Sequence, residues 1–306
     1  MNKLCISLLL CLTATYARAQ RYDTASIFNT PVSMDTVVVR AARGGWDVQG
    51  FIKKIQTDTT FYKAFKSIRI LPYNAQNDIR VYGSDNEIIA SMRSKTVQHV
   101  FKTCRSMQTF DSHTTGDFYK KNGDYTYYTA ALYDYLFFTK DTVCNNSDVV
   151  AGSMEAQGSG SIEKNKYRLK QLIFNPGSKI TGVPLIGNKA SVFDADEAGK
   201  YDFHLSSEDF DGEACYVFKV TPKPEAADDV VFNELTTWFR KSDYSIVARN
   251  YSLSYHTLLY DFDVHMKVRT AHIGNRLLPT SIDYDGNWHV LAQKRERVKF
   301  ICTLSY

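Results

Sequence analysis

Two short motifs in this chain carry the residue types of a serine acyl-transfer site. Ser161-Ile-Glu-Lys164 matches the SxxK motif of the penicillin-recognising enzymes, and Ser84-Asp-Asn86 matches their SDN motif. In this sequence SDN precedes SxxK, no KTG follows, and Ser161 stands where the N-cap of a helix is expected. The order and the context of the two motifs therefore argue against this chemistry.

The sequence also contains no motif for metal or nucleotide binding. The seven histidines form neither HExxH nor HxH, and Asp194, Asp196 and Glu197 lack the spaced acidic residues and glycine of a calcium loop. GxSxG, Walker and GxGxxG sequences are absent as well. We predict a protein that is not an enzyme and has no metal or cofactor. A hydrolase whose Asp and His side chains converge from several strands is the remaining catalytic alternative.

The first nineteen residues have the pattern of a secretory signal peptide. Lys3 is followed by an apolar run over residues 6–12 and by the small-x-small site Ala17-Arg18-Ala19. We predict cleavage after Ala19 and export to the periplasm. An outer-membrane lipoprotein modified at Cys11 conflicts with the bulky Leu10, because lipid-modification sites have a small residue there. No later stretch reaches the ~20 apolar residues of a membrane-spanning helix, so we predict no transmembrane segment in the mature chain.

Charge and cysteine usage narrow the partners further. The chain has 37 basic and 33 acidic residues, and this near balance argues against nucleic acid, whose binders carry a concentrated basic face. Four cysteines remain after residue 19, and none of them forms a CxxC pair. An exported protein can form disulfides. Cys104 with Cys144 is the first candidate pair, and Cys215 and Cys302 are expected to be buried strand residues.

Strand patterns dominate the last hundred residues. Within residues 261–269, Phe262, Val264, Met266 and Val268 alternate with charged residues, which predicts a strand with one buried face. Similar segments cover residues 201–206, 214–221, 230–241, 245–255, 260–273, 277–285 and 296–306, with turns at residues 211–212, 242–243, 274–275 and 285–286. Short connections between consecutive strands predict a strongly curved antiparallel meander.

The earlier part of the chain predicts the helices. Residues 20–45 are expected to be an extended segment in which residues 35–40 could form a first or edge strand. A helix near residues 47–67 would be capped by Asp47, and a second amphipathic helix is expected near residues 161–174. Asn122-Gly123 predicts a hairpin, and residues 129–138 fit either a strand or a short helix. We expect residues 46–306 to form a single domain.

Three segments resemble a known family. Residues 233–241 with 245–251 resemble a strand pair of the outer-membrane lipoprotein carrier and sorting proteins, and residues 169–177 and 283–288 resemble an uncharacterised subgroup of Gram-negative exported proteins related to them. The resemblance implies a mainly β (α+β) fold, an incomplete β-barrel with about two amphipathic helices on its concave face. It also implies a non-enzymatic carrier that shelters the acyl chains of lipoproteins or lipids in an apolar cavity.

The predicted lining of that cavity consists of apolar residues that alternate on one side of the strands or lie along the helices. These residues are Phe51, Ile55, Leu169, Leu172, Tyr216, Phe218, Trp238, Phe262, Val264, Met266, Val298, Phe300 and Leu304. The same residues would also suit a dry core. The main alternative is therefore a binding or assembly module of the cell envelope, with a filled core, a protein partner and no lipid cargo.

Overall fold

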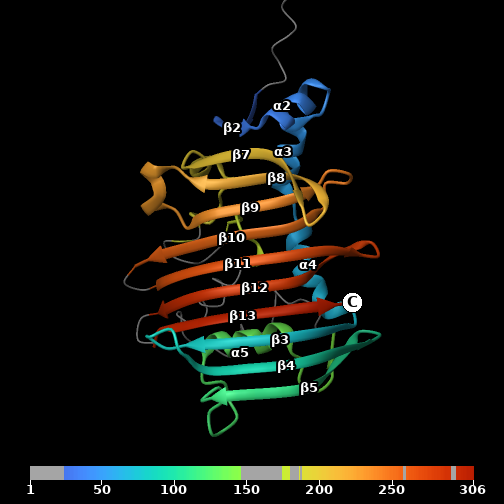
Figure 1. The fold of residues 1–306 in the computed structure, drawn as a ribbon, viewed down its shortest axis with the longest axis vertical. Helices are drawn as coiled ribbons and strands as arrows, with labels where there is room; N and C mark the ends of the chain where they lie inside the picture. The colour runs from blue at the N-terminus through green and yellow to red at the C-terminus, as the bar shows by residue number, and fades with distance from the viewer. Residues whose placement is uncertain (1–23, 146–173, 180–185, 187, 258–259, 291–293) are drawn as a thin grey trace, which may run out of the picture.

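The computed structural model describes residues 24–145, 174–179, 186, 188–257, 260–290 and 294–306. Its main feature is one sheet of thirteen strands in the order β1-β2-β7-β8-β9-β10-β11-β12-β13-β3-β4-β5-β6 (Figure 1). The long strands are β7 Tyr201–Phe210, β8 Glu213–Pro222, β9 Phe232–Arg240, β10 Ile246–His256, β11 Tyr260–Ile273, β12 Arg276–Val290, β13 Glu296–Ser305, β3 Tyr73–Tyr82, β4 Ile88–Phe101 and β5 Cys104–Gly116. The predicted meander is confirmed over β7 to β13.

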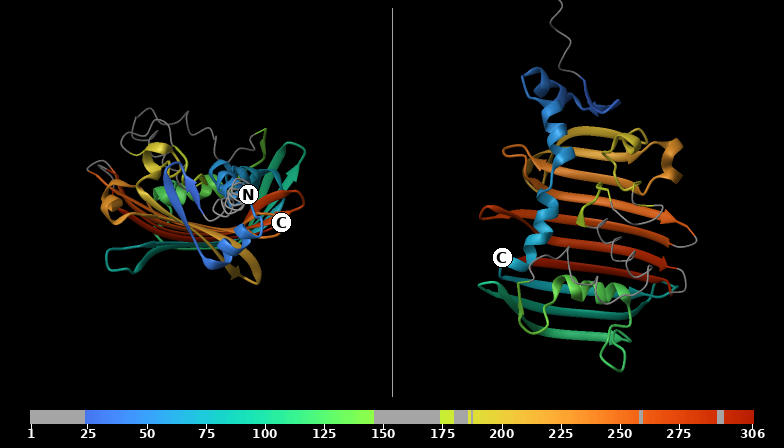
Figure 2. Two further views of the ribbon diagram at one scale, coloured as in Figure 1. Left: turned by 90° about the horizontal axis from the view of Figure 1, so that it is seen from above. Right: turned by 180° about the vertical axis from the view of Figure 1, so that it is seen from behind.

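Early and late parts of the chain meet in the middle of this sheet. β13 pairs antiparallel with β3, from Arg297 opposite Tyr82 to Ser305 opposite Asn74. The outermost strands are short, β1 Ala25–Ile27 and β2 Thr30–Met34 on one side and β6 Val143–Cys144 on the other. The sheet is curved and open (Figure 2), and among the described strands only β2 and β7 pair in parallel. The predicted incomplete barrel is thus confirmed.

The helices lie on the inner side of the curve, which we call the concave face; the opposite side is the convex face (Figure 2). The helix expected near residues 47–67 is present as α3 Val48–Thr57 and α4 Thr60–Ser67. Asp47 caps α3 as predicted, with its Oδ1 accepting a hydrogen bond from Gly50 N at 2.8 Å. Asp58 separates the two helices, and its Oδ1 accepts from Thr60 N at 2.9 Å. Residues 161–173 of the helix expected near 161–174 lie outside the described residues, as does the predicted signal peptide.

The region of residues 20–45 differs from the prediction. β1 and β2 are extended, but Thr36–Arg43 forms the helix α2, so the strand expected at residues 35–40 is wrong. Asp35 decides the outcome because its Oδ1 accepts from Val38 N at 2.7 Å and caps the helix. Val38 and Ala42, four residues apart, then bury one helical face. A run of β-branched residues is therefore overridden by a cap and a helical burial pattern.

The structure also answers the predictions for residues 129–138 and for the turn at Asn122-Gly123. Residues 129–138, which fit either a strand or a helix, form the helix α5 Tyr128–Phe137. The turn at Asn122-Gly123 is present, but around it the described residues show only the isolated bridge of Tyr119 with Tyr125. The predicted hairpin is thus reduced to one tight turn.

The turn predicted at Asp285-Gly286 is wrong because β12 continues through it. Gly286 pairs with Val264 of β11 and with Val298 of β13. A Cβ atom at Gly286 would lie 2.0 Å from the hydroxyl oxygen of Tyr284. The glycine therefore allows this phenol ring to lie across the strand, where its hydroxyl accepts a hydrogen bond from the indole of Trp288.

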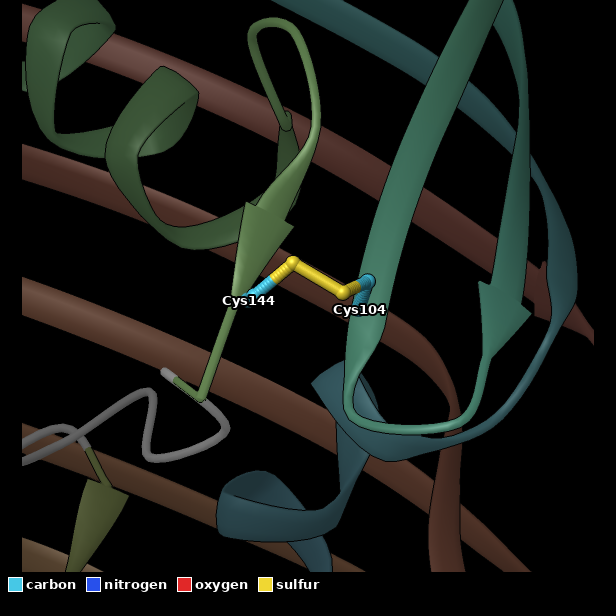
Figure 3. Close-up of a disulfide and its surroundings, with 2 residues drawn as sticks. All are labelled: Cys104 and Cys144. Carbon is cyan, nitrogen blue, oxygen red and sulfur yellow. A yellow bond between two sulfur atoms is a disulfide. The ribbon is translucent and has the colours of Figure 1, made fainter.

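The cysteines match the prediction. Cys104 of β5 and Cys144 of β6 form a disulfide that attaches the last short strand to the sheet (Figure 3). Cys215 and Cys302 are free and buried. The remaining short elements are η1 Ile68–Ile70, α8 Ala195–Ala198 and η3 Pro224–Asp229.

Candidate ligand-binding face

The centre of the concave face is built by three neighbouring strands. Phe262 and Val264 of β11 are fully buried, while the alternate residues Asp263 and His265 are exposed on the convex face. The pairing register continues the apolar surface, because Met266 lies opposite Tyr284 of β12, which lies opposite Phe300 of β13. The rings of Tyr284 and Phe300 stack with their centroids 4.6 Å apart. Period-two alternation thus creates one continuous aromatic and aliphatic surface.

The α3 side of the concave face carries a second aromatic group. Phe51 of α3 lies edge-on to Phe239 of β9, with centroids 5.3 Å apart, and 5.7 Å from Tyr216 of β8. Trp46, just before α3, stacks on Tyr216 at 4.0 Å. Ile55 is buried one turn further along the helix. The apolar side of α3 is therefore packed onto β8 and β9.

The α5 side of the face combines aromatic and polar contacts. The ring of Tyr133 lies 4.9 Å from that of Phe300, so α5 covers the β13 end of the apolar surface. The hydroxyl of Tyr133 donates to Asn77 Oδ1 of β3 at 2.6 Å. Asn77 in turn donates to Ser94 Oγ and Thr96 Oγ1 of β4, both at 3.3 Å. The concave face is therefore polar beneath α5, and the polar side chains there hydrogen-bond to one another.

The structure brings most of the predicted lining residues together. Nine of them are buried in the main core cluster, and Tyr216 packs against it: these are Phe51, Ile55, Phe218, Phe262, Val264, Met266, Val298, Phe300 and Leu304 with Tyr216. Leu169 and Leu172 lie outside the described residues.

Trp238 is a correction, because it lies on the convex face. Its register partner on β8 is Val217, and it clusters with Val217, Cys215 and Ala248. Its indole N–H donates to Glu208 Oε1. Phe239, the next residue, is the aromatic side chain that β9 places on the concave face. The sequence did not distinguish the two because Leu235 to Phe239 are all buried, which removes the alternation.

A buried charge on the concave face was not predicted. Arg249 of β10 is buried beneath α4, with its guanidinium carbon 4.4 Å from the centroid of the Phe61 ring. Its Nε donates to Thr237 Oγ1 at 2.9 Å. Burial lowers the pKa of this guanidinium to about 10. The side chain remains a cation at neutral pH and joins the α4 helix to the sheet.

Among the described residues, the convex face carries many charged side chains. A hollow of about 580 Å³ lies across β11, β12, β13 and β3. Two ion pairs lie in its wall: Arg80 Nη2 lies 2.7 Å from Asp78 Oδ2, and Lys299 Nζ lies 2.6 Å from Asp285 Oδ2. No group of three His, Cys, Asp or Glu side chains suited to a metal ion occurs in the described ranges. Ser84 lies in the β3–β4 turn, whereas Ser161 and Lys164 are outside the described residues.

None of the helices in the described part of the chain is both long and apolar enough to cross a membrane. No protein-family model matches the sequence, and no curated protein matches it. Among solved structures, a DUF1329 family protein from Desulfovibrio piger matches over 81% of this chain and 92% of its own, with 12% identity and a TM-score of 0.23. A domain from Vibrio parahaemolyticus assigned as an outer membrane lipoprotein-sorting protein matches over 80% of this chain and 89% of its own, with 10% identity and a TM-score of 0.27.

The resemblance noted in the sequence thus recurs among the structural matches. At these identities and TM-scores, the two matches carry no argument for the function of this chain.

Proposed function

We propose that this protein is an exported, periplasmic carrier that binds the acyl chains of lipoproteins or lipids on the concave face of its sheet. The observation that carries the proposal is the continuous apolar surface from β8 to β13, roofed by amphipathic helices on an open sheet. An acyl chain gains roughly 0.8 kcal/mol per buried methylene, so such a surface competes with a membrane without specific polar contacts.

The helices supply the route of entry in this proposal. Phe51 and Ile55 of α3 and Phe61 and Phe65 of α4 are buried against the sheet, while Lys53, Lys54 and Lys63 of the same helices face outward. Cargo would take the place of the helical side chains when α3 and α4 move away from β8 to β12. The disulfide of Cys104 with Cys144 supports an oxidising compartment such as the periplasm.

One observation favours a second candidate. Phe262, Val264 and Leu253 are completely buried by the protein's own side chains. A binding or assembly module of the cell envelope, with a filled core and a protein partner, would have this interior. The two candidates differ in one measurable property, the uptake of an acyl chain.

The test uses two substitutions of adjacent residues on β11. Met266 is buried on the concave face and Lys267 is exposed on the convex face. The protein without residues 1–19 is titrated with a fluorescent fatty acid, and lipids extracted from the protein purified from its own envelope are identified by mass spectrometry. We expect saturable binding that unlabelled palmitate displaces.

Met266→Gln places an amide on the apolar surface, which costs about 1–3 kcal/mol for an unpaired polar group and should weaken acyl binding roughly tenfold. Lys267→Gln should leave the affinity unchanged. Circular dichroism and a urea midpoint establish that both variants are folded. If the folded wild-type protein neither binds the fatty acid nor co-purifies with acyl species, the filled-core module is the correct function.

A further inference from the structure

A pocket of about 380 Å³ lies at the edge of the concave face, between the helices and the ends of two hairpins. One wall is formed by α3, α4 and the residue Asp58 between them. The other wall is formed by residues 243–245 of the β9–β10 turn and by residues 272 and 275–277 at the β11–β12 turn. Because α4 packs against β12, these two walls face each other across the pocket (Figure 1).

The spacing of residues along α4 gives this helix two different sides. Thr60, Lys63 and Ser67 recur at intervals of three and four residues, and all three line the pocket. Phe61 and Phe65 are four residues apart and are buried. The apolar side of α4 is therefore packed in the core, while a polar side of the same helix borders the pocket.

Three cationic side chains line the pocket, Lys54 of α3, Lys63 of α4 and Arg276 of β12. All three residues are exposed, and none of them forms an ion pair within the described part of the chain. The Nζ atom of Lys54 lies 5.2 Å from the centroid of the Tyr244 ring. Positive charges that line one hollow from both of its walls attract an anion that enters it.

Two carboxylates also line the pocket, and both are engaged by their own neighbours. Asp58 Oδ1 accepts from the N–H and from the hydroxyl of Thr60, both at 2.9 Å. Asp243 Oδ1 accepts from Ser245 N at 2.9 Å and from Ser245 Oγ at 2.7 Å, and its Oδ2 lies 3.4 Å from Arg240 Nη1. With three cations against two carboxylates, one of them also paired with Arg240, the pocket has a net positive charge.

Two apolar side chains connect the pocket to the concave face. Tyr244 and Leu277 line the pocket, and both also pack against the main core cluster. The ring of Tyr244 lies 5.1 Å from that of Phe51 on α3, measured between centroids. A hydrocarbon chain with its polar end in the pocket could thus pass along Tyr244 and Leu277 to the apolar surface beneath the helices.

We propose that this pocket binds the negatively charged head group of an acyl compound, a carboxylate or a phosphate, with Lys63 on one side and Arg276 on the other. Ammonium and guanidinium groups form charge-assisted hydrogen bonds with both kinds of anion. The inference rests on the proposed carrier function and narrows its cargo to fatty acids and anionic lipids.

The experiment compares three ligands that have the same chain and differ in the head group. The protein without residues 1–19 is dialysed to equilibrium against radiolabelled laurate, dodecyl phosphate or dodecanol, each below its micelle concentration, at mildly alkaline pH and constant ionic strength. We expect at least one of the anions to bind about fivefold or more tightly than dodecanol, the combined effect of two partly exposed charge contacts. The tighter anion identifies the head group, and equal affinities of the two anions show that charge alone is recognised.

Paired substitutions locate the site. Lys63→Gln/Arg276→Gln removes two exposed charges, so the fold should be kept, and the preference for the anion should fall to within about twofold while the affinity for dodecanol is unchanged. The matched control Lys53→Gln/Arg93→Gln removes one lysine and one arginine from exposed positions outside the pocket. It has the same net charge as the pocket variant and should keep the full preference. Circular dichroism establishes that both variants are folded.

The outcomes separate this inference from the carrier function. If dodecanol binds the wild-type protein as tightly as both anions, or if the folded pocket variant keeps the preference, the head-group site is wrong and the carrier function stands. If none of the three ligands binds the folded wild-type protein, the carrier function is wrong, and the head-group site is wrong with it.

Discussion

The carboxylate of Glu296 connects β13 to the start of α5, and its removal gives the sharpest test of how the helix is held on the concave face. Its Oε1 accepts from Tyr128 N at 2.6 Å, and its Oε2 accepts from Thr129 N and from Thr129 Oγ1, both at 2.9 Å. The side chain of Tyr127, the residue at the N-cap position, makes no capping hydrogen bond. A strand residue therefore caps this helix in place of a local one.

Glu296→Gln keeps the shape of the side chain but removes its charge. One carbonyl oxygen remains to accept, while the new NH₂ group faces N–H donors of the helix. Loss of a charge-assisted hydrogen bond and of the interaction with the positive helix end should lower the free energy of unfolding by about 2–3 kcal/mol. Because α5 covers Phe300, the variant should also bind more of a dye that fluoresces on apolar surfaces.

The assay is urea unfolding followed by tryptophan fluorescence, with Glu225→Gln as the control because Glu225 is exposed in η3. We expect a lower midpoint for Glu296→Gln with an unchanged slope, and no shift for the control. A loss below about 0.5 kcal/mol, the range of an ordinary surface substitution, would show that the contacts of Glu296 do not hold α5 in place.

Two further predictions concern the cysteines. The disulfide closes a loop with a sequence separation of 40, so the double variant Cys104→Ser/Cys144→Ser should lose about 4 kcal/mol of unfolding free energy in the chain-entropy model; reductant should destabilise the wild-type protein and leave the variant unaffected, and equal responses would refute the bond. Burial raises the pKa of the Cys302 thiol to about 12 and raises that of Cys215 above its usual value, so both stay protonated and unreactive at mildly alkaline pH. A thiol reagent should label neither in the native protein without residues 1–19 and both in urea, and fast native labelling would contradict their burial.

The sequence predicted best those strands in which one face is buried and the other is wet. β11 was expected at residues 260–273 and is found there, because its exposed residues are charged and its buried residues apolar. The family resemblance also led to the correct architecture, an open curved sheet with helices inside. Such alternation determines which residues share a face before any pairing is known.

Prediction failed where both faces are buried or where one side chain decides a local choice. Trp238 and Phe239 are both buried, so only the register with Val217 and Tyr216 shows which of them is concave. The register depends on β8 and β9 together and is absent from either segment alone. The side chain of Asp35 caps a helix that begins in a run of β-branched residues. At Asp285-Gly286 the ring of Tyr284 lies over the glycine, and the strand continues where the sequence predicted a turn.

For the candidate sites, the sequence predicted the apolar residues but not the buried arginines. Apolar lining residues were found because alternation marks them. Arg69, Arg105 and Arg249 were missed because an arginine in a sequence is expected to be exposed, and their burial depends on α4, α5 and η1 packing against distant strands. Arg249 stands two residues before Tyr251 and four before Leu253, in phase with the buried face of β10, and this is the signal that could have been noticed.

The pairing of β3 with β13 determines when the sheet can be completed during folding. Residues 74–82 have no partner on that side until residues 297–305 have been made, so the middle of the sheet cannot form before both parts of the chain are available. Under the proposed export, this late pairing would help to keep the chain in the unfolded state that a secretion channel requires. The same delay leaves two half-sheets with bare edges, so a chaperone that shields strands should be needed most at that stage.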